Sequence, residues 1–280
     1  MGRGCLHAGT SSWSEKSWVG PFYPKGTQPG DFLRHYATVY DCVEADVTYY
    51  RVPDSRLVDG WVEKTPDNFR LCAKFPKTIV HCGRAAAPDG DRVLVPEHTA
   101  VDTGRFLEAM ARLGERCGPL VLQFPYFNKR AFASKDPFLD RLDAFLDALP
   151  SEFRYAVEIR NKNWVGEDLL QVLREHSVAL CLVDLVYMPH PARLADELNL
   201  VTTNFIYGRL IGDRKAVDAK TDTFDEIVLD QSDRLKRWAR LLDKMLEQVP
   251  DAWIFANNHY AGHGPSTIDE LVENVEMLDA

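Results

Sequence analysis

The chain has 280 residues, a formal net charge of −9 at pH 7 and a hydrophobic content of 45%. That length allows one large domain or two small ones, since barrels of about 250 residues commonly form a single domain. The acidic balance counts against broad, sequence-independent binding to nucleic acid, which needs a positive field, although a local basic patch is compatible with it.

Nothing in the sequence indicates a membrane or secreted protein. The residues after Met1 lead into a short apolar stretch that lacks the long hydrophobic region of a signal peptide. No run approaches the roughly 20 apolar residues of a membrane helix. The six cysteines are scattered without a CxxC pair, which is typical of reduced, buried thiols. We therefore expect a cytoplasmic protein without a disulfide framework.

Short strand-like runs alternate with amphipathic helical stretches along the whole chain. The predicted strands are Leu6–Thr10, Cys42–Thr48, Arg70–Phe75, Leu120–Phe124, Tyr155–Ile159, Val178–Val183, Phe205–Leu210 and Trp253–Ala256. The predicted helices are Gly30–Tyr40, Asp54–Lys64, Thr103–Arg116, Pro137–Leu149, Glu167–His176, Ser232–Gln248 and Ser266–Leu278. The segment Leu185–Asn204 is interrupted by Pro189 and Pro191, which predicts a degenerate crossover.

This alternation predicts an α/β protein, a (β/α)8 TIM-like barrel with one degenerate crossover, as a single domain over residues 1–280. The alternative is an open doubly wound sheet, but no GxGxxG motif follows the first strand. The connections after the third, fourth, sixth and seventh strands are long. In a barrel these connections all lie at the C-terminal mouth, so we expect the functional site there.

Several predicted strands carry polar residues near their C-terminal ends, where a parallel strand covered on both faces should be apolar. Glu44, Asp46 and Thr48 share one face of the second strand. The other polar residues are Lys74, Gln123, Glu158, Arg160, Asp184, Arg209, Asn257, Asn258 and His259. Buried charges are costly unless they pair. The pattern therefore indicates acids and bases around a wet ligand pocket, or a salt-bridge network that only braces the barrel.

Two segments offer backbone N–H groups and hydroxyls to a phosphate. One is Gly9–Ser12 after the first strand, with Thr10 and Ser11 as candidate ligand contacts, and the other is Gly262–Ser266 before the last helix. The alternative interpretation is a helix cap. Trp13 could line a binding site for a sugar or a base, or it could be a packing residue.

Other chemistries find less support in the sequence. His259 and His263 are separated by a glycine-containing loop and HExxH is absent, so a divalent metal is not favoured and no cofactor is assigned. No GxSxG elbow exists, and His81 is merely adjacent to Cys82. Two carboxylates on separate strands, those of Glu44 and Glu158, could face each other as an acid–base pair.

Taken in order, the motifs resemble the YecE-like family, also called domain of unknown function 72. They are Gly9-Thr10-Ser11-Ser12-Trp13, the segment 18–24, Val43–Arg51, Phe69–Lys74 with His81, Gln123-Phe124-Pro125, Val157–Arg160 with Asn163-Trp164, Tyr207-Gly208-Arg209 and Asn257–Pro265. The resemblance spans nearly the whole chain. It implies a TIM-like barrel but no reaction, because fold is no substitute for a site.

The chain departs from the family pattern at three positions. Asp46, Val80 and Ile211 stand where the family usually has Asn, Thr and His. The aspartate adds negative charge beside Glu44, which favours a cation or lowers the affinity for an anion. The missing histidine weakens any mechanism that needs it as a proton shuttle or ligand.

Three functions fit these observations. The first is an enzyme, in the hydrolase, isomerase or lyase class, acting on a small phosphorylated or sugar-like anion. Its base would be Glu44 or Glu158, its acid His81 or Lys74, and its ligand-orienting groups Arg160, Arg209, Asn257 and Asn258.

The second is a non-catalytic metabolite-binding module that uses the same pocket. The third is a metal-dependent nucleic-acid-processing enzyme, placed last because of the acidic balance and the incomplete ligand set. The sequence leaves the oligomeric state open.

Overall fold

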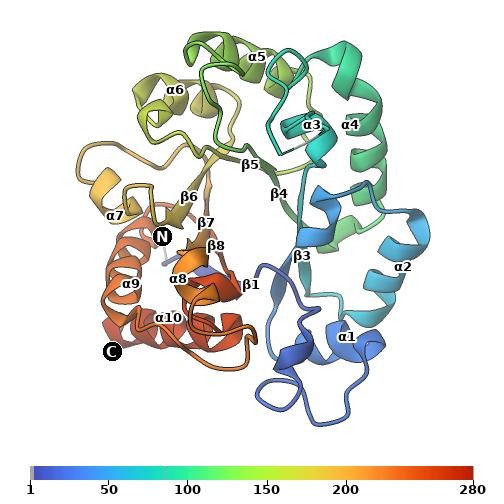
Figure 1. The fold of residues 1–280 in the computed structure, drawn as a ribbon, viewed down its shortest axis with the longest axis vertical. Coiled ribbons are helices and arrows are strands. Elements are labelled where there is room, and N and C mark those ends of the chain that lie inside the picture. Colours follow the sequence, from blue (N-terminus) through green and yellow to red (C-terminus); the bar gives the residue numbers. More distant parts are fainter. Residues whose placement is uncertain (1–2, 85, 280) are drawn as a thin grey trace.

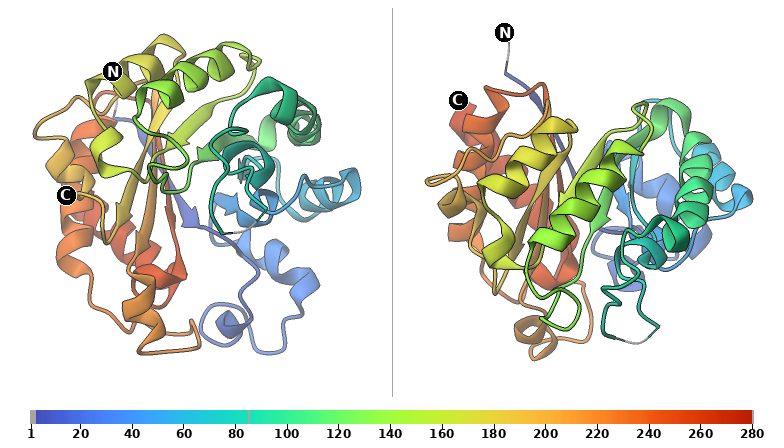
Figure 2. Two further views of the ribbon diagram at one scale, coloured as in Figure 1. Left: turned by 45° about the horizontal axis from the view of Figure 1, so that its top comes forward. Right: turned by 90° about the horizontal axis from the view of Figure 1, so that it is seen from above.

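The computed structural model describes residues 3–84 and 86–279. Eight parallel strands form one sheet in the order β1-β8-β7-β6-β5-β4-β3-β2. Their bounds are Cys5–Thr10 (β1), Cys42–Ala45 (β2), Arg70–Lys74 (β3), Cys117–Gln123 (β4), Tyr155–Glu158 (β5), Ala179–Leu185 (β6), Phe205–Gly212 (β7) and Asp251–Ala256 (β8). The sheet curls into a nearly closed barrel with the helices outside it (Figures 1 and 2). The predicted single-domain, TIM-like α/β fold is confirmed.

Helices connect successive strands around the barrel. The longer ones are α2 (Ser55–Lys64), α4 (Pro96–Ala111), α5 (Asp136–Asp147), α6 (Glu167–Glu175), α9 (Ser232–Leu246) and α10 (Gly264–Asp279), and the shorter ones are α1 (Phe32–Tyr36), α3 (Lys77–Val80), α7 (Pro191–Leu194) and α8 (Arg214–Asp218). Within the described chain, α7 is the only α-helix between β6 and β7, so this crossover is degenerate as predicted. No helix in the described ranges is both long and apolar enough to span a membrane.

Several predicted boundaries are wrong, and two of them have a clear physical reason. The second strand ends at Ala45 instead of Thr48, because residues Asp46–Tyr49 turn into a 3₁₀ helix, η3. The hydroxyl of Thr48 then accepts the amide of Lys74 at 2.9 Å, where a longer strand would have continued the ladder. The helix predicted to begin at Thr103 corresponds to α4 and begins at Pro96, because proline is well tolerated in the first turn of a helix.

The seam between β1 and β2 is bridged by a side chain, since no backbone ladder joins these strands in the described part of the chain. The buried Tyr36 hydroxyl accepts the amide of Thr10 at 2.8 Å and donates to the carbonyl of Cys42 at 3.3 Å. Gly9 permits this approach, because a Cβ there would stand 2.4 Å from the Cys42 carbonyl oxygen. A tyrosine hydroxyl thus takes the place of a ladder hydrogen bond.

Tyr36→Phe is expected to lower the free energy of unfolding by about 1–3 kcal/mol, because the buried Thr10 amide loses its acceptor. Urea unfolding followed by circular dichroism measures the change. Tyr40→Phe is the matched control, because its hydroxyl bonds Asp269 at the surface, at 2.8 Å, and should cost less. Equal losses in the two variants would contradict the bridging role of Tyr36.

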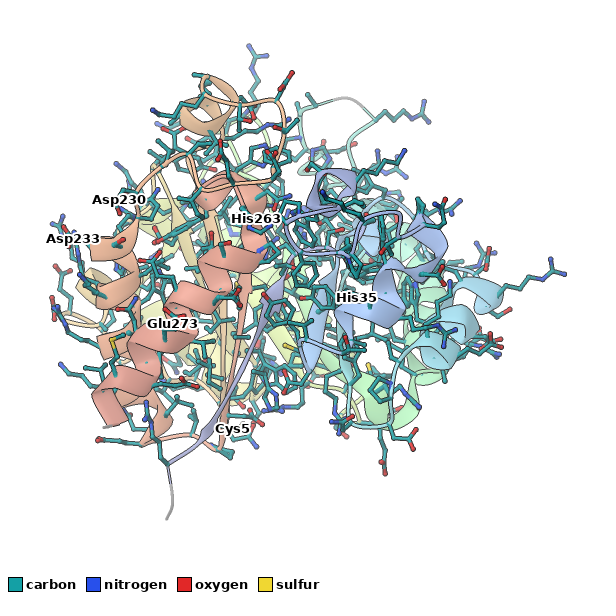
Figure 3. All side chains as sticks on the ribbon, turned by 90° about the horizontal axis from the view of Figure 1, so that it is seen from below. Cys5, His35, Asp230, Asp233, His263 and Glu273 are labelled. Atoms are coloured by element: carbon teal, nitrogen blue, oxygen red, sulfur yellow. The ribbon has the colours of Figure 1, made fainter. Side chains whose placement is uncertain are left out.

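The barrel interior contains an apolar cluster and becomes polar at the carboxyl ends of the strands. A buried apolar cluster fills it, made of Cys42, Cys72, Val121, Ala156, Ala179, Cys181, Phe205, Tyr207, Trp253 and Phe255. Cys5 marks the amino-terminal end of β1, and His263 marks the opposite end, where α10 begins (Figure 3). Inward positions at that C-terminal end are polar, which makes it the end to search for a site.

Candidate functional site

A layer of charged and polar side chains lies inside the C-terminal mouth of the barrel. We define this charged layer as Glu44 (β2), Asp46 (η3), Lys74 (β3), Gln123 (β4), Glu158 (β5), Arg160 (after β5) and Arg209 (β7). Its members are joined by hydrogen bonds and ion pairs. Three carboxylates balance three cations, so the layer is formally neutral.

Arg209 is the centre of the charged layer. Its Nη1 donates to Gln123 Oε1 at 2.7 Å and to Glu158 Oε2 at 2.5 Å, and its Nε donates to Glu44 Oε1 at 3.1 Å. The side chain is only 2% exposed. Burial alone would lower the pKa of this guanidinium, but the carboxylates of Glu44 and Glu158 raise it well above its usual value. One permanent cation therefore links three strands across the barrel.

Glu44 is fully buried and satisfied by three different donors. The Tyr207 hydroxyl donates to its Oε2 at 2.7 Å, Arg209 contacts its Oε1, and Lys74 Nζ lies 3.3 Å from the same oxygen. Lys74 also pairs with Asp46, whose side chain is 39% exposed. Both oxygens of the Glu44 carboxylate therefore have partners inside the barrel.

Glu158 is also fully buried, between two arginines. Its Oε2 accepts from Arg209, and its Oε1 accepts from Arg160 Nε at 2.7 Å. Although burial alone would raise the pKa of the Glu158 carboxyl, the charges of Arg209 and Arg160 lower it to about 2. The group is ionised at neutral pH and is a weak base there, since a general base works best with a pKa near the operating pH.

Arg160 is the member of the charged layer that presents cationic donors to solvent. Its side chain is 24% exposed, against 4% for Lys74 and 2% for Arg209. Glu158 holds its Nε, while Nη1 and Nη2 make no hydrogen bond with any residue that the structure describes. The guanidinium is thus fixed at one edge and open at the other.

Two tyrosines, Tyr49 and Tyr187, lie near this open guanidinium. Burial raises the pKa of Tyr49 and of Tyr187, and the nearby charge of Arg160 partly offsets the rise in both. Both hydroxyls therefore stay protonated at neutral pH and can donate. Tyr50, Tyr126 and Tyr187, from loops after β2, β4 and β6, are 65%, 59% and 50% exposed. Exposed aromatic rings at a mouth suit a ligand with a flat or sugar-like face.

An apolar cluster lies on the side of β6 and β7. Val183, Leu185 and Met188 are buried together, with Val165 and Ile211 packed against them. Ile211 is the position where the family pattern has histidine. This chain therefore has an apolar wall at that position, which offers neither a proton shuttle nor a ligand.

Asp184 does not join the charged layer. Because side chains alternate along a strand, Asp184 points to the opposite face from Val183. Its Oδ2 accepts from the Tyr260 hydroxyl at 2.8 Å and from Trp238 Nε1 at 3.0 Å, and Arg234 pairs with the same carboxylate. The structure places it between β6 and α9, as a fully buried anchor for the helix.

The predicted ligand contacts after β1 and β8 lie outside the charged layer. Ser11 Oγ and Trp18 Nε1 are buried without a hydrogen-bond partner and lie at a cavity of about 30 Å³, which is far smaller than a metabolite site. Asn258 Oδ1 accepts the first amide of α10 at 2.9 Å. His263 Nδ1 accepts the amide of Ser266 at 3.3 Å. The segment Gly262–Ser266 thus forms a helix cap, the alternative interpretation of its glycines and hydroxyls.

Trp13, Asn257 and His259 likewise have protein partners. Trp13 stands edge-on to Trp61, with ring centroids 5.8 Å apart. Asn257 Oδ1 accepts the amide of His259 at 3.0 Å, and His259 Nε2 lies 3.1 Å from Asp218 Oδ1. Burial lowers the pKa of His259, which disfavours its cationic form at neutral pH.

Two tyrosines in or near the charged layer, Tyr207 and Tyr187, were not predicted as site residues, and the predicted acid His81 lies apart from the layer. Tyr207 stands two positions before Arg209 on the same strand face, a spacing that would have indicated it. Tyr187, in a loop, carried no such signal. His81 lies in the loop after α3, where its Nδ1 accepts the amide of Gly83 at 3.1 Å, and no contact with the charged layer is recorded for it in the described residues.

Metal-binding side chains do not cluster in the described residues. Across residues 3–84 and 86–279, no three or more His, Cys, Asp or Glu side chains form a group that could hold a metal ion. The acids of the charged layer are instead neutralised by lysine and arginine.

Fold and site together define a TIM-like barrel protein whose mouth is braced by a charged layer and keeps one accessible guanidinium. The model of the family described as "Protein of unknown function DUF72" matches residues 7–279. The chain belongs to this family, as the resemblance of its motifs predicted.

Known relatives agree with this assignment. The chain is 35% identical over 162 residues to the UPF0759 protein YecE of Escherichia coli K12, and it matches the YecE protein of Escherichia coli O157:H7 equally well. The 162 residues are 58% of this chain and 51% of each relative. The match therefore spans about half the length of these curated relatives.

Solved structures show the same fold. A DUF72 family protein from Thermotoga maritima MSB8 has a TM-score of 0.72 at 23% identity, covering 98% of this chain and 99% of that one. Another from Enterococcus faecalis V583 has a TM-score of 0.69 at 20% identity, with 97% and 96% coverage.

Proposed function

We propose that the protein binds a small metabolite carrying a phosphate or carboxylate group at the C-terminal mouth of the barrel. The observation that carries this proposal is the geometry of Arg160. Its Nε is held by Glu158 at 2.7 Å, and its two terminal nitrogens are open in the described structure. A guanidinium fixed in this way can donate two parallel hydrogen bonds to a phosphate or carboxylate.

The surroundings of Arg160 suit the remainder of such a ligand. The tyrosine hydroxyls of Tyr49 and Tyr187 add neutral donors beside the guanidinium. The exposed tyrosine rings and the apolar wall around Met188 offer surfaces to a sugar ring or base. Phosphorylated sugars and nucleotides combine these features.

The geometry favours binding over acid–base catalysis by Glu44 or Glu158. Both carboxylates are fully buried, and each is held by at least two cationic or hydroxyl donors. A ligand recovered chemically unchanged supports a metabolite-binding module. Conversion of the ligand to a product, abolished in Glu44→Gln, would favour an enzyme instead.

Arg160→Lys is expected to weaken binding of the best ligand at least tenfold, because lysine cannot reproduce the two parallel hydrogen bonds. The ligand is chosen by thermal shift from a panel of sugar phosphates, nucleotides and dicarboxylates, and its affinity is measured by isothermal titration calorimetry. Lys162→Ala, an exposed residue two positions on, is the matched control and should bind like the wild type. Equal affinity in the Arg160 variant and the wild type would refute the proposal.

A further inference from the structure

A second basic surface lies outside the barrel, between α7 and α9. We call it the α7–α9 groove, a cavity of about 340 Å³ whose walls carry Arg193, Arg237, Arg240 and Lys244, with Asp196 as its one carboxylate and Leu241 on its floor. Four cations are gathered there in a chain whose net charge is −9. None of them belongs to the charged layer of the mouth.

The groove exists because the crossover after β6 is degenerate. In a regular barrel a full helix lies beside α9, but here only the four-residue α7 occupies that place (Figure 1). One face of α9 is therefore left open on that side. Arg237, Arg240 and Lys244 occupy this face at spacings of three and four residues, which places them in one row.

None of the four cations of the groove forms an ion pair in the part of the chain that the structure describes, although Asp196 lines the same groove. Arg193, Arg237, Arg240 and Lys244 make no ion pair or hydrogen bond with another described side chain, and all four are exposed. Some arginines elsewhere have partners, as Arg154 does with Asp251 at 2.6 Å, whereas Arg34 and Arg56 have none among the described residues. The groove is therefore distinguished by gathering four such cations in one place.

The spacing of the charges along α9 also favours an external anion. Like charges three and four residues apart on a helix destabilise it, whereas a simply solvated face interleaves both signs. Arg237, Arg240 and Lys244 follow one another without an acid in the same row, although Asp233 and Glu247 stand at its two ends. Such a row calls for an external anion of several charges.

We propose that the α7–α9 groove binds the polyphosphate chain of a small molecule. Guanidinium groups pair with phosphate oxygens through two parallel hydrogen bonds, and cations on both walls can neutralise a chain of two or three phosphates. The groove volume of about 340 Å³ lies within the range of small-molecule sites. His190 forms a wall only, because its Nε2 faces Asp184 Oδ2 at 3.6 Å and its Nδ1 accepts the amide of Ala192.

Calorimetric titration with sodium tripolyphosphate at low ionic strength tests this site, with orthophosphate as the low-charge comparison. We expect one equivalent to bind, more tightly than orthophosphate, and Arg240→Ala combined with Lys244→Ala to weaken it at least tenfold. Lys236→Ala, an exposed cation of α9 outside the groove, is the matched control. These titrations are made in the Arg160→Ala background, which removes the proposed anion site at the mouth, so that the one equivalent measured belongs to the groove.

Two further titrations identify the source of the polyphosphate. Tighter binding of ATP than of tripolyphosphate supports a nucleoside polyphosphate, and equal binding supports recognition of the phosphate chain alone. The proposal is overturned if tripolyphosphate binds no better than orthophosphate, or if the double variant binds like the wild type. It is also overturned if a single-stranded oligonucleotide binds more tightly than either polyphosphate, because the surface would then recognise a nucleic-acid backbone.

Discussion

Arg209→Met is expected to lower the free energy of unfolding by about 3–5 kcal/mol, the largest loss among the changes considered, because it leaves buried carboxylates without their shared cation. Glu44 would keep Lys74 and Tyr207, and Glu158 would keep Arg160, but each would lose its contact with Arg209 in a site closed to water. Urea unfolding of the variant and the wild type, with equal slopes in denaturant, measures the loss.

Neutralising the carboxylates together with the arginine provides the control. The triple variant Arg209→Met, Glu44→Gln and Glu158→Gln should regain much of the lost stability, because no unpaired anion is left buried beside the methionine. Arg112→Met, which removes a half-exposed pair with Asp59, should cost less than about 1 kcal/mol. If Arg209→Met cost no more than Arg112→Met, the charged layer would not be the brace described above.

The second large effect depends on pH and concerns Glu158. Its pKa of about 2 in the folded chain lies below the ordinary value of 4.5, so the ionised carboxylate stabilises the fold above pH 4.5 and loses this effect as the pH falls toward 2. The advantage of the wild type over Glu158→Gln should be about 3 kcal/mol at pH 7 and about 1 kcal/mol at pH 3. Denaturant unfolding at a series of pH values measures it.

A surface carboxylate supplies the comparison for this pH series. Glu63→Gln, at an exposed position of α2, should change stability by less than about 0.5 kcal/mol at either pH. An advantage of the wild type over Glu158→Gln that stays constant between pH 7 and pH 3 would mean that Glu158 does not titrate as its two arginine partners require.

The sequence allowed the fold and most of the charged layer to be predicted. Strand periodicity places alternate residues on one face, so the sequence alone assigns five residues to the mouth: Glu44, Lys74, Gln123, Glu158 and Arg209. Their pairing partners depend on which strands lie opposite each other across the barrel. That arrangement is a property of the closed sheet, which no local pattern records.

Other site residues could not be placed from the sequence for physical reasons. Asp184 is one position out of phase with the inward residues of β6, and a strand buried on both faces gives no polar alternation to reveal which face is inward. Asp46 reaches Lys74 from a 3₁₀ helix that the strand-like pattern concealed. His81 lies in the loop after α3 and His259 in the short 3₁₀ helix after β8, and tertiary contacts set the path of both segments.

A crystal structure of the protein with the best small anion of the screen tests the central claim most directly. The account predicts a phosphate or carboxylate group within hydrogen-bond distance of both Nη1 and Nη2 of Arg160, with Glu158 still accepting from Nε. A ligand bound elsewhere, with the terminal nitrogens of Arg160 occupied by protein side chains, would contradict it.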